Sequence, residues 1–252
     1  MDLPLPECAL AVGAHPDDIE FGCGATLAKW AAAGCRIHHV ILTDGSKGSW
    51  DPDVDVAGLV HQRMEESRGA AAIIDGVAGT GRPTPDRVFF LQQVDGELAN
   101  GVDERRAVAR IIRQVQPTVV LAHDPWRRYR LHPDHRAAGF ITLDAVVAAR
   151  DHHFFADLNL PPHRPQVLLL FEADQPNHVE DAAGFEGAKI EALLAHQSQF
   201  ESTMAIRPDA DEPPTGGDGR SAFAAKVRRQ LTDHGSLAGR PSGEAFHVMT
   251  DL

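Results

Sequence analysis

The feature that most constrains this chain is the alternation of short apolar runs with helical segments along its 252 residues. The apolar runs are nearly continuous, which is typical of strands that are buried on both faces of a parallel sheet. We therefore expect an α/β protein with a Rossmann-like, doubly wound and mostly parallel sheet that carries helices on both faces. The expected strands cover residues 8–14, 36–45, 87–91, 118–125 and 166–173, and the expected helices cover 24–34, 60–74, 104–115, 133–150 and 185–196.

Three segments rich in glycine, proline or charged residues are expected to form loops. They cover residues 45–58, 126–131 and 207–220, and the last of them has the composition of a mobile loop. The chain length suits one large α/β domain, and we find no internal repeat or compositional boundary. We expect a single domain over residues 1–252.

The charge balance excludes several classes of partner. Lys plus Arg is 24 and Asp plus Glu is 36, so the formal net charge is −12. A chain this acidic is a poor general binder of nucleic acid or of anionic membranes. It has neither a bilayer-length apolar run nor the features of a secretion signal at residues 1–24, and its three cysteines lack metal-site spacing. We expect a cytoplasmic protein without a nucleic-acid or membrane partner, and a homo-oligomer stays open.

A His-Pro-Asp-Asp tetrapeptide at residues 15–18 directly follows the first expected strand. In open α/β sheets, ligands bind beyond the carboxyl ends of the strands, so this tetrapeptide lies where a site is expected. The alternative is an ordinary helix start, because proline suits the first turn and aspartate there favours the helix dipole. The tetrapeptide alone favours that alternative.

A second His-Pro-Asp segment, at residues 132–135, follows the expected strand at 118–125. His132 and His135 are three residues apart and share one face of a helix, although such a pair is common on surfaces. Two such segments at the same expected edge of the sheet favour a shared site.

The spacing of these residues suits a catalytic metal. His15 and Asp18 can face one point, whereas Asp17 lies about 100° round the helix from Asp18. One carboxylate is therefore available to bind a metal and the other stays free. A catalytic zinc takes three protein ligands and leaves one position for water. The spacing leaves the choice between His132 and His135 as the third ligand open, and these ligand types suit other divalent metals too.

The two segments also resemble a known family. "AHPDDIEFGCGATLAK" and "HPDHRAAG" are similar to the two signature motifs of the PIG-L/LmbE-like zinc deacetylases. "TDGSKG", "FLQQVDGEL", "IIRQVQPTVVLAHDP", "KIEALLAHQSQF" and "GEAFHVM" resemble further family segments in the same order. The resemblance implies one Zn²⁺ per site. It also implies hydrolysis of the N-acetyl group of an N-acetylglucosamine-type substrate, a sugar conjugate or a small chito-oligosaccharide.

Residue by residue, the resemblance implies that His15, Asp18 and His135 are the zinc ligands. It makes Asp17 the general base that deprotonates the attacking water. Protonated His132 would stabilise the oxyanion and donate a proton to the leaving amine. Asp134 would orient a histidine, as carboxylates beside metal ligands commonly do, or it is simply a charge at a helix start.

Several positively charged residues are candidates for substrate binding. Arg63 matches the substrate-binding arginine of the family, and its alternative is an ion pair with Glu66. Arg127, Arg128 and Arg130 precede the second motif and would attract an anionic substrate group, or they belong to a solubilising loop. His123 and Asp124 end a strand at the same edge, but neither the motifs nor the spacing gives them a role.

Other functions stay open at this point. One is an amidase that cleaves a larger acyl group or a thiol S-conjugate. Another is a nucleotide-binding protein, but the Gly-x-Gly-x-x-Gly turn that it needs after the first strand is missing. A third is a metal-dependent phosphoesterase, which commonly holds two metals and needs more ligands than the motifs supply.

Overall fold

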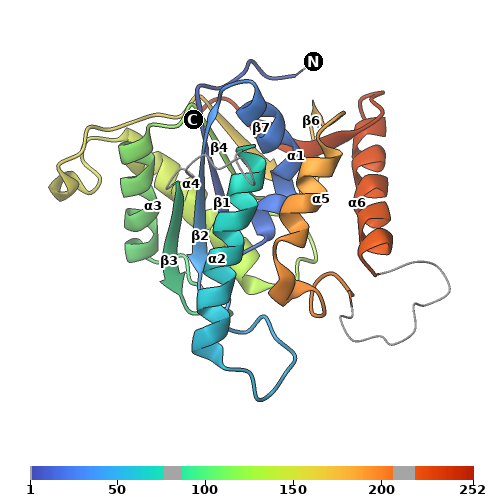
Figure 1. Ribbon diagram of the computed structural model, residues 1–252. Coiled ribbons are helices and arrows are strands. Elements are labelled where there is room, and N and C mark those ends of the chain that lie inside the picture. The colour runs from blue at the N-terminus through green and yellow to red at the C-terminus, as the bar shows by residue number, and fades with distance from the viewer. Residues whose placement is uncertain (1, 77–86, 207–218) are drawn as a thin grey trace.

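The computed structural model describes residues 2–76, 87–206 and 219–252, and one seven-stranded sheet runs through it (Figure 1). The strand order is β3-β2-β1-β4-β5-β7-β6. Strands β1 to β5 are parallel, and β7 runs antiparallel to both β5 and β6. The expected mostly parallel sheet is therefore confirmed. The strands are β1 (Cys8–Gly13), β2 (Arg36–Thr43), β3 (Val88–Gln93), β4 (Val119–His123), β5 (Val167–Phe171), β6 (His178–Asp181) and β7 (Gly243–Met249).

Helices cover both faces of the sheet (Figure 1). Helices α3 and α4 pack together on one face, and α1, α2 and α5 pack on the other. Helix α6 packs against β6, β7 and α5 at one end of the sheet. The helices are α1 (Asp18–Ala32), α2 (Val56–Ile74), α3 (Val102–Val115), α4 (Pro133–Arg150), α5 (Glu186–Leu194) and α6 (Gly219–Ser236).

Strand β1 contributes side chains to two hydrophobic cores, one on each face of the sheet. Leu10 and Val12 point into the core beneath α3 and α4, whereas Ala9 and Ala11 point into the core beneath α1 and α2. All four side chains are fully buried, as expected for a central strand that alternates between two covered faces. The strand order reverses between β1 and β4, so these two carboxyl ends form the switch point where such sheets bind ligands.

The closing part of the chain differs from the prediction. No element was expected after residue 196, yet β7 pairs with β5 inside the sheet and α6 covers it. Residues 207–218 of the expected mobile loop lie outside the described residues, and Gly219 and Arg220 already belong to α6. The sheet is mixed because this late strand enters it antiparallel.

Helix α1 contains a kink that the closing strand stabilises. Cys23 has φ −150° and ψ 18°, so the helix is interrupted there and a new helical start follows. The amides of Ala25 and Thr26 donate to the buried carboxylate of Glu244 in β7, at 3.2 and 2.8 Å. Lys189 Nζ lies 2.6 Å from the same carboxylate. A carboxylate is favourable at a helix start, and the lysine neutralises its charge in the core.

Two further expectations concern the whole chain. Cys8, Cys23 and Cys35 are free and buried, consistent with their interpretation as small apolar residues. Across the described residues, no helix combines the length and apolar character that crossing a bilayer requires.

Candidate active site

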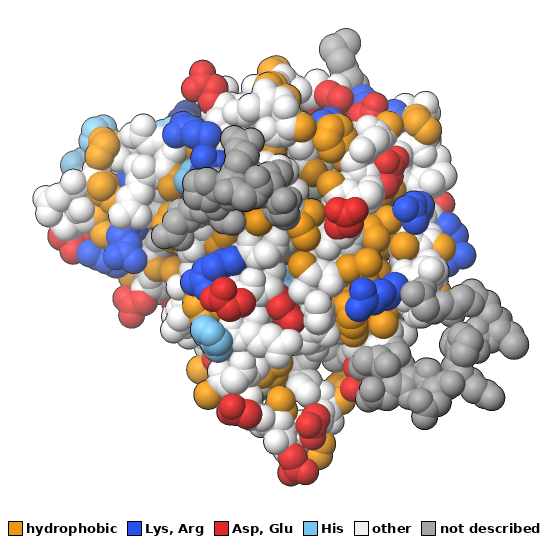
Figure 2. All heavy atoms as spheres, viewed as in Figure 1, with side chains coloured by type: hydrophobic (Ala, Val, Ile, Leu, Met, Phe, Trp, Pro, Cys, Tyr) orange, Lys and Arg blue, Asp and Glu red, His pale blue; other side chains and the backbone are white. Residues whose placement is uncertain are grey.

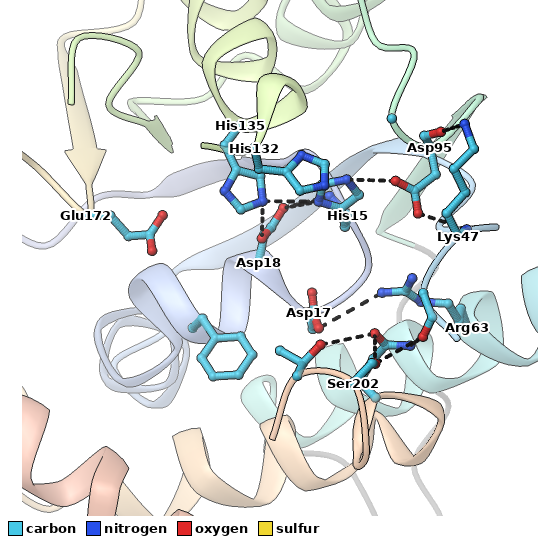
Figure 3. Close-up of a pocket in the computed structure, with 15 residues that line it drawn as sticks. His15, Asp17, Asp18, Lys47, Arg63, Asp95, His132, His135, Glu172 and Ser202 are labelled. Atoms are coloured by element: carbon cyan, nitrogen blue, oxygen red, sulfur yellow. Dashed lines mark hydrogen bonds and ion pairs between the residues drawn. The ribbon is translucent and has the colours of Figure 1, made fainter. Parts of the chain in front are cut away.

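The two His-Pro-Asp segments lie side by side at the carboxyl ends of β1 and β4 (Figure 3). They form one wall of a cavity of about 450 Å³. The cavity is lined by His15, Asp17, Asp18, Phe21, Lys47, Gly48, Arg63, Asp95, Gly96, His132, His135, Glu172, Gln199, Ser202 and Thr203. The structure thus brings together residues that are more than a hundred positions apart in the chain.

Three side chains from these segments converge on one point. His15 Nδ1 lies 3.2 Å from His135 Nε2 and 3.3 Å from Asp18 Oδ2, and His135 Nε2 lies 3.3 Å from Asp18 Oδ1. In a tetrahedral zinc site with ligand bonds of about 2.0–2.1 Å, neighbouring ligand atoms are about 3.3 Å apart. Two imidazoles and one carboxylate are also a common donor set for divalent metals. The arrangement therefore fits a single divalent ion.

The described residues contain three overlapping groups of side chains able to hold an ion, and each includes His15 or His135. The groups are His15 with His132 and His135, Asp18 with His123 and His135, and His15 with Asp95 and Asp134. The histidines and carboxylates around this point are thus more numerous than one ion needs, and the additional ones are available to orient ligands.

The far nitrogen of His15 is held by two carboxylates. Nε2 lies 3.1 Å from Asp134 Oδ2 and 3.2 Å from Asp95 Oδ1. Carboxylates accept hydrogen bonds, so Nε2 carries a hydrogen, and Nδ1 faces His135 and Asp18. A carboxylate in this position is able to orient a histidine ligand, the role that stays a prediction for Asp134. Burial alone would lower the pKa of His15, but Asp134, Asp18 and Asp95 together raise it well above its usual value.

Sequence reasoning missed Asp95. It lies just beyond the end of β3, which was expected as a strand, but no His-Pro-Asp segment follows that strand to mark a site there. The resemblance covered this residue within "FLQQVDGEL" but gave it no role. The backbone amide of Lys47 donates to Asp95 Oδ2 at 3.1 Å, which joins this segment to the turn after β2.

Asp17 is separated from Asp18 by an unusual backbone conformation. Asp17 precedes α1 with φ 112° and ψ −25°, a left-handed conformation that is strained for a residue other than glycine. The side chain is turned towards Arg63, whose Nη2 lies 4.0 Å from its carboxylate (Figure 3). Burial raises the pKa of Asp17 to about 6, although the positive charge of Arg63 acts in the opposite direction. A carboxyl group with a pKa near neutrality is suited to act as a general base.

Arg63 is fixed beneath the cavity by the glycine-rich turn after β2. Its guanidinium donates from Nη1 to the Gly45 carbonyl at 2.7 Å and from Nη2 to the Pro16 carbonyl at 2.8 Å. A Cβ atom on Gly48 would lie 2.2 Å from Arg63 Nη1, so a larger residue there would displace the guanidinium or the turn. The alternative partner Glu66 instead accepts hydrogen bonds from the Ser198 amide and hydroxyl.

His132 lies at the start of α4 and lines the cavity. Its Nδ1 accepts the backbone amide of Asp134 at 3.3 Å, and its ring meets the His15 ring edge-on at 4.5 Å. Burial lowers the pKa of His132, and the neighbouring positive charges of His15 and His135 lower it further. Since Nδ1 accepts the Asp134 amide, the hydrogen of the ring is on Nε2, where it is available as a donor, and the protonated form expected during the reaction stays a prediction.

The three arginines before the second motif are outside the cavity lining. Arg127 and Arg128 are exposed, and they pair with Glu172 at 3.5 Å and with Asp174 at 2.7 Å. Arg130 is buried, and its Nη1 lies 2.8 Å from Glu172 Oε2. Contact of these arginines with a substrate stays a prediction.

The structure supplies contacts for His123 and Asp124, for which the sequence gave no role. His123 Nε2 lies 3.2 Å from Asp18 Oδ2, and its Nδ1 lies 3.2 Å from Glu172 Oε2. Asp124 accepts the backbone amides of Trp126 and Asp174, which fixes the loop after β4. The only sequence signal for His123 and Glu172 is their position at the carboxyl ends of β4 and β5.

Comparisons with known proteins agree with this geometry. A family model described as PIG-L, GlcNAc-PI de-N-acetylase, matches residues 10–146, which include both His-Pro-Asp segments. The diacetylchitobiose deacetylase of Thermococcus kodakarensis is 34% identical over 194 residues, covering 76% of this chain and 69% of that protein. The 1D-myo-inositol 2-acetamido-2-deoxy-α-D-glucopyranoside deacetylase of Streptomyces scabiei is 31% identical, covering 76% of each chain.

A solved structure extends the similarity to nearly the whole fold. The N,N'-diacetylchitobiose deacetylase from Pyrococcus horikoshii, in complex with an inhibitor, superposes with a TM-score of 0.82 and 26% sequence identity. The match covers 97% of this chain and 84% of that one. Together with the family match over more than half of the sequence, this shows that the chain belongs to the PIG-L family of de-N-acetylases.

Proposed function

We propose that this protein is a metal-dependent hydrolase that removes the N-acetyl group from N-acetylglucosamine-type sugars. The observation that carries the proposal is the convergence of His15, Asp18 and His135 in a cavity. His15 Nδ1 and His135 Nε2 lie 3.2 Å apart, and each lies 3.3 Å from one oxygen of Asp18. The family match and the relatives named as deacetylases support the same reaction.

We assign His15, Asp18 and His135 as the ligands of one Zn²⁺ ion per site. The ligand set also suits other divalent metals, so the choice of zinc follows the family. When bound there, a divalent ion polarises the acetyl carbonyl and lowers the pKa of water from 15.7 towards about 7. The three carboxylates around His15, which raise its pKa, are also the environment in which a cation is stabilised.

Asp17 and His132 handle the protons and the developing charge. The Asp17 carboxylate accepts a proton from the attacking water, whose oxygen forms the new bond to the acetyl carbon. The N–H at Nε2 of His132 donates a hydrogen bond to the carbonyl oxygen as it becomes negative. A single donor of this kind contributes about 3 kcal/mol. The C–N bond then breaks, the proton held by Asp17 passes to the amine nitrogen, and acetate and the free amino sugar leave.

The charge distribution favours a neutral substrate. Asp51, Asp53 and Asp55 are exposed in the loop before α2, where Figure 2 shows acidic side chains at the lower tip of the molecule. The chain as a whole carries a formal charge of −12, which repels anionic ligands. We therefore place small neutral sugars such as N,N'-diacetylchitobiose first among the substrates. The free cysteines suit a reducing cytoplasm, and the shared sheet suits a single domain over residues 1–252.

The test is an assay of free amine and acetate over a substrate panel. The panel contains N,N'-diacetylchitobiose, N-acetylglucosamine, its inositol conjugate, N-propionyl and N-butyryl glucosamine, and a sugar phosphate. We expect equal amounts of amine and acetate from the acetylated sugars and no phosphate release. Faster cleavage of the longer acyl groups would favour the amidase alternative, and phosphate release without amine would contradict the proposal.

A further inference from the structure

His123 is a fully buried histidine beside the proposed metal ligands, and the mechanism above does not use it. It is the last residue of β4, and its ring stacks on that of His135 with centroids 4.4 Å apart and planes 13° apart. Phe171 packs edge-on against the other side, with centroids 4.5 Å apart. The ring therefore has one available orientation, with a nitrogen towards Asp18 and a nitrogen towards Glu172.

The hydrogen bond between His123 and Asp18 has a defined direction. Asp18 Oδ2 accepts the backbone amide of His15 at 2.7 Å, so this oxygen acts as a hydrogen-bond acceptor. A carboxylate only accepts, so Nε2 of His123 is the donor across the 3.2 Å contact. Arg130 Nη1, which only donates, lies 3.1 Å from Nδ1. If Nδ1 of His123 is an acceptor, the single ring hydrogen is on Nε2. If the ring is doubly protonated, Nε2 also has a hydrogen. The Ala14 amide also points its N–H at Nε2, but at 3.5 Å this contact is longer and weaker than the 3.2 Å contact with Asp18.

The two oxygens of Asp18 therefore have different surroundings. Oδ2 lies 2.7 Å from the His15 amide and 3.2 Å from His123 Nε2, so it receives two hydrogen bonds. Oδ1 lies 3.3 Å from Nε2 of His135. Rotation of the carboxylate about its last bond would break both hydrogen bonds to Oδ2. Oδ2 also lies 3.3 Å from His15 Nδ1, but Oδ1 is the oxygen without a backbone or His123 hydrogen bond and is therefore the one left available to an ion.

Glu172 in turn holds His123. Its Oε2 lies 3.2 Å from His123 Nδ1 and 2.8 Å from Arg130 Nη1. Glu172 follows β5 with φ 53°, a left-handed conformation that is costly for a residue with a side chain. Backbone strain of this kind persists where the surrounding contacts hold it in place. Here the Glu172 side chain contacts His123, and His123 contacts Asp18.

We propose that His123 is a positioning residue whose Nε2–H makes Asp18 a one-oxygen ligand, with Glu172 and Arg130 holding the imidazole in place. The inference rests on the proposed function insofar as Asp18 is a metal ligand. The inference goes beyond the proposed function because it states that His123 affects the metal affinity without binding the metal.

A pair of matched variants tests this assignment. In His123→Gln, the amide nitrogen is separated from Cα by the same number of bonds as Nε2 of histidine, so a donor towards Asp18 is retained. In His123→Asn, the amide reaches only the position of Nδ1, and the donor is lost. His163→Asn is the control, because His163 contacts the Pro117 carbonyl at 2.8 Å and is outside the cavity lining.

The readout is zinc affinity, measured by chelator competition with Zn²⁺ alone and without any substrate. We expect the asparagine variant to bind zinc about 10–100-fold more weakly, and the glutamine variant to stay within about threefold of the wild type. The absorption spectrum of the Co²⁺-loaded protein should change in the asparagine variant and be retained in the glutamine variant. Thermal unfolding of the metal-free variants identifies any loss of folding.

Two results would overturn the inference. Wild-type affinity in the asparagine variant would show that the donor does not matter. An equal loss in both variants would show that His123 acts as a ligand itself, within the group that it forms with Asp18 and His135, or only through ring packing. If the variants behave as expected but no amino sugar is deacetylated, the inference holds and the proposed function fails.

Discussion

Nδ1 of His15 lies 3.2 Å from Nε2 of His135, although 120 positions separate the two residues in the chain. Two features of the fold produce this contact. Strands β1 and β4 are neighbours at the point where the strand order reverses, and each leads into a His-Pro-Asp segment, directly after β1 and through a short loop after β4. Without a cation, this point combines several carboxylates with imidazoles in a buried environment, which is costly. The arrangement is therefore explained most simply as a site for a divalent ion.

Replacing the proposed base should separate catalysis from metal binding. Asp17→Asn keeps the size of the side chain but removes its ability to accept a proton from water. We expect the variant to bind as much zinc as the wild type while kcat falls by about 10²–10⁴-fold. Amine release under saturating substrate and metal analysis of the same sample measure both quantities. An Asp17→Asn variant with full activity would remove the base assignment.

The same carboxylate predicts the acid side of the pH profile. Burial raises the pKa of Asp17 to about 6, and only the ionised form accepts a proton. Activity is therefore retained above this pKa and lost as the pH falls through it. A bound cation favours the carboxylate, so the acid limb of kcat/KM in the metal-loaded enzyme should lie at or below pH about 6. A limb above that value, with metal content unchanged, would contradict the assignment.

The glycine-rich turn after β2 should be sensitive to a single methyl group. In Gly48→Ala the new Cβ would lie 2.2 Å from Nη1 of Arg63, so the guanidinium or the turn must move. Because Arg63 also holds the Pro16 carbonyl next to Asp17, we expect kcat/KM to fall by about tenfold or more. Steady-state kinetics on the acetylated sugar measure the change.

Gly69→Ala in α2 is the matched control for that substitution. A Cβ at Gly69 meets nothing within 4 Å, so this variant should retain full activity and be at least as stable as the wild type. Equal activity of the two alanine variants would show that the close approach of Gly48 to Arg63 is not needed.

The buried pair beneath the kink of α1 predicts a loss of stability. Lys189 and Glu244 have side chains that are 3% and 1% exposed, and their charged atoms lie 2.6 Å apart. Glu244→Gln leaves the lysine charge unpaired in the core, which should lower the free energy of unfolding by about 3–5 kcal/mol. Urea denaturation measures this change. Adding Lys189→Met to Glu244→Gln should recover part of the loss, and a single variant as stable as the wild type would refute the role of the pair.

The sequence was sufficient for the parallel part of the fold because each strand from β1 to β5 contains an apolar run, which is mostly buried in β1, β2, β4 and β5 and partly buried in the edge strand β3. It was insufficient for the closing segment. Strand β6 is short and polar, and β7 carries the buried charge of Glu244, so neither shows an apolar run. Helix α6 buries only Phe223, Val227 and Leu231 as apolar side chains. Their spacing of four residues is the one signal that could have revealed this helix.

Within the site, the sequence motifs identified the residues that come together, but not the neighbouring residues that position them. The spacing placed Asp17 away from Asp18, and the left-handed backbone at Asp17 adds to that separation. The roles of Asp95 and Glu172 depend on contacts between strand ends far apart in the chain, which no local pattern encodes. The lowered pKa of His132 likewise depends on neighbours that only the folded structure supplies.

The most direct test of the account is the metal content of His135→Ala compared with that of the wild type. Both proteins, and the exposed-histidine variant His152→Ala as a control, are loaded with zinc, freed of excess ion and analysed for bound metal and for acetate release. The account predicts one zinc per chain and acetate release in the wild type and in His152→Ala, and the loss of both in a folded His135→Ala. A folded His135→Ala protein that retains zinc with wild-type affinity would contradict the claim that the two segments bind one ion together.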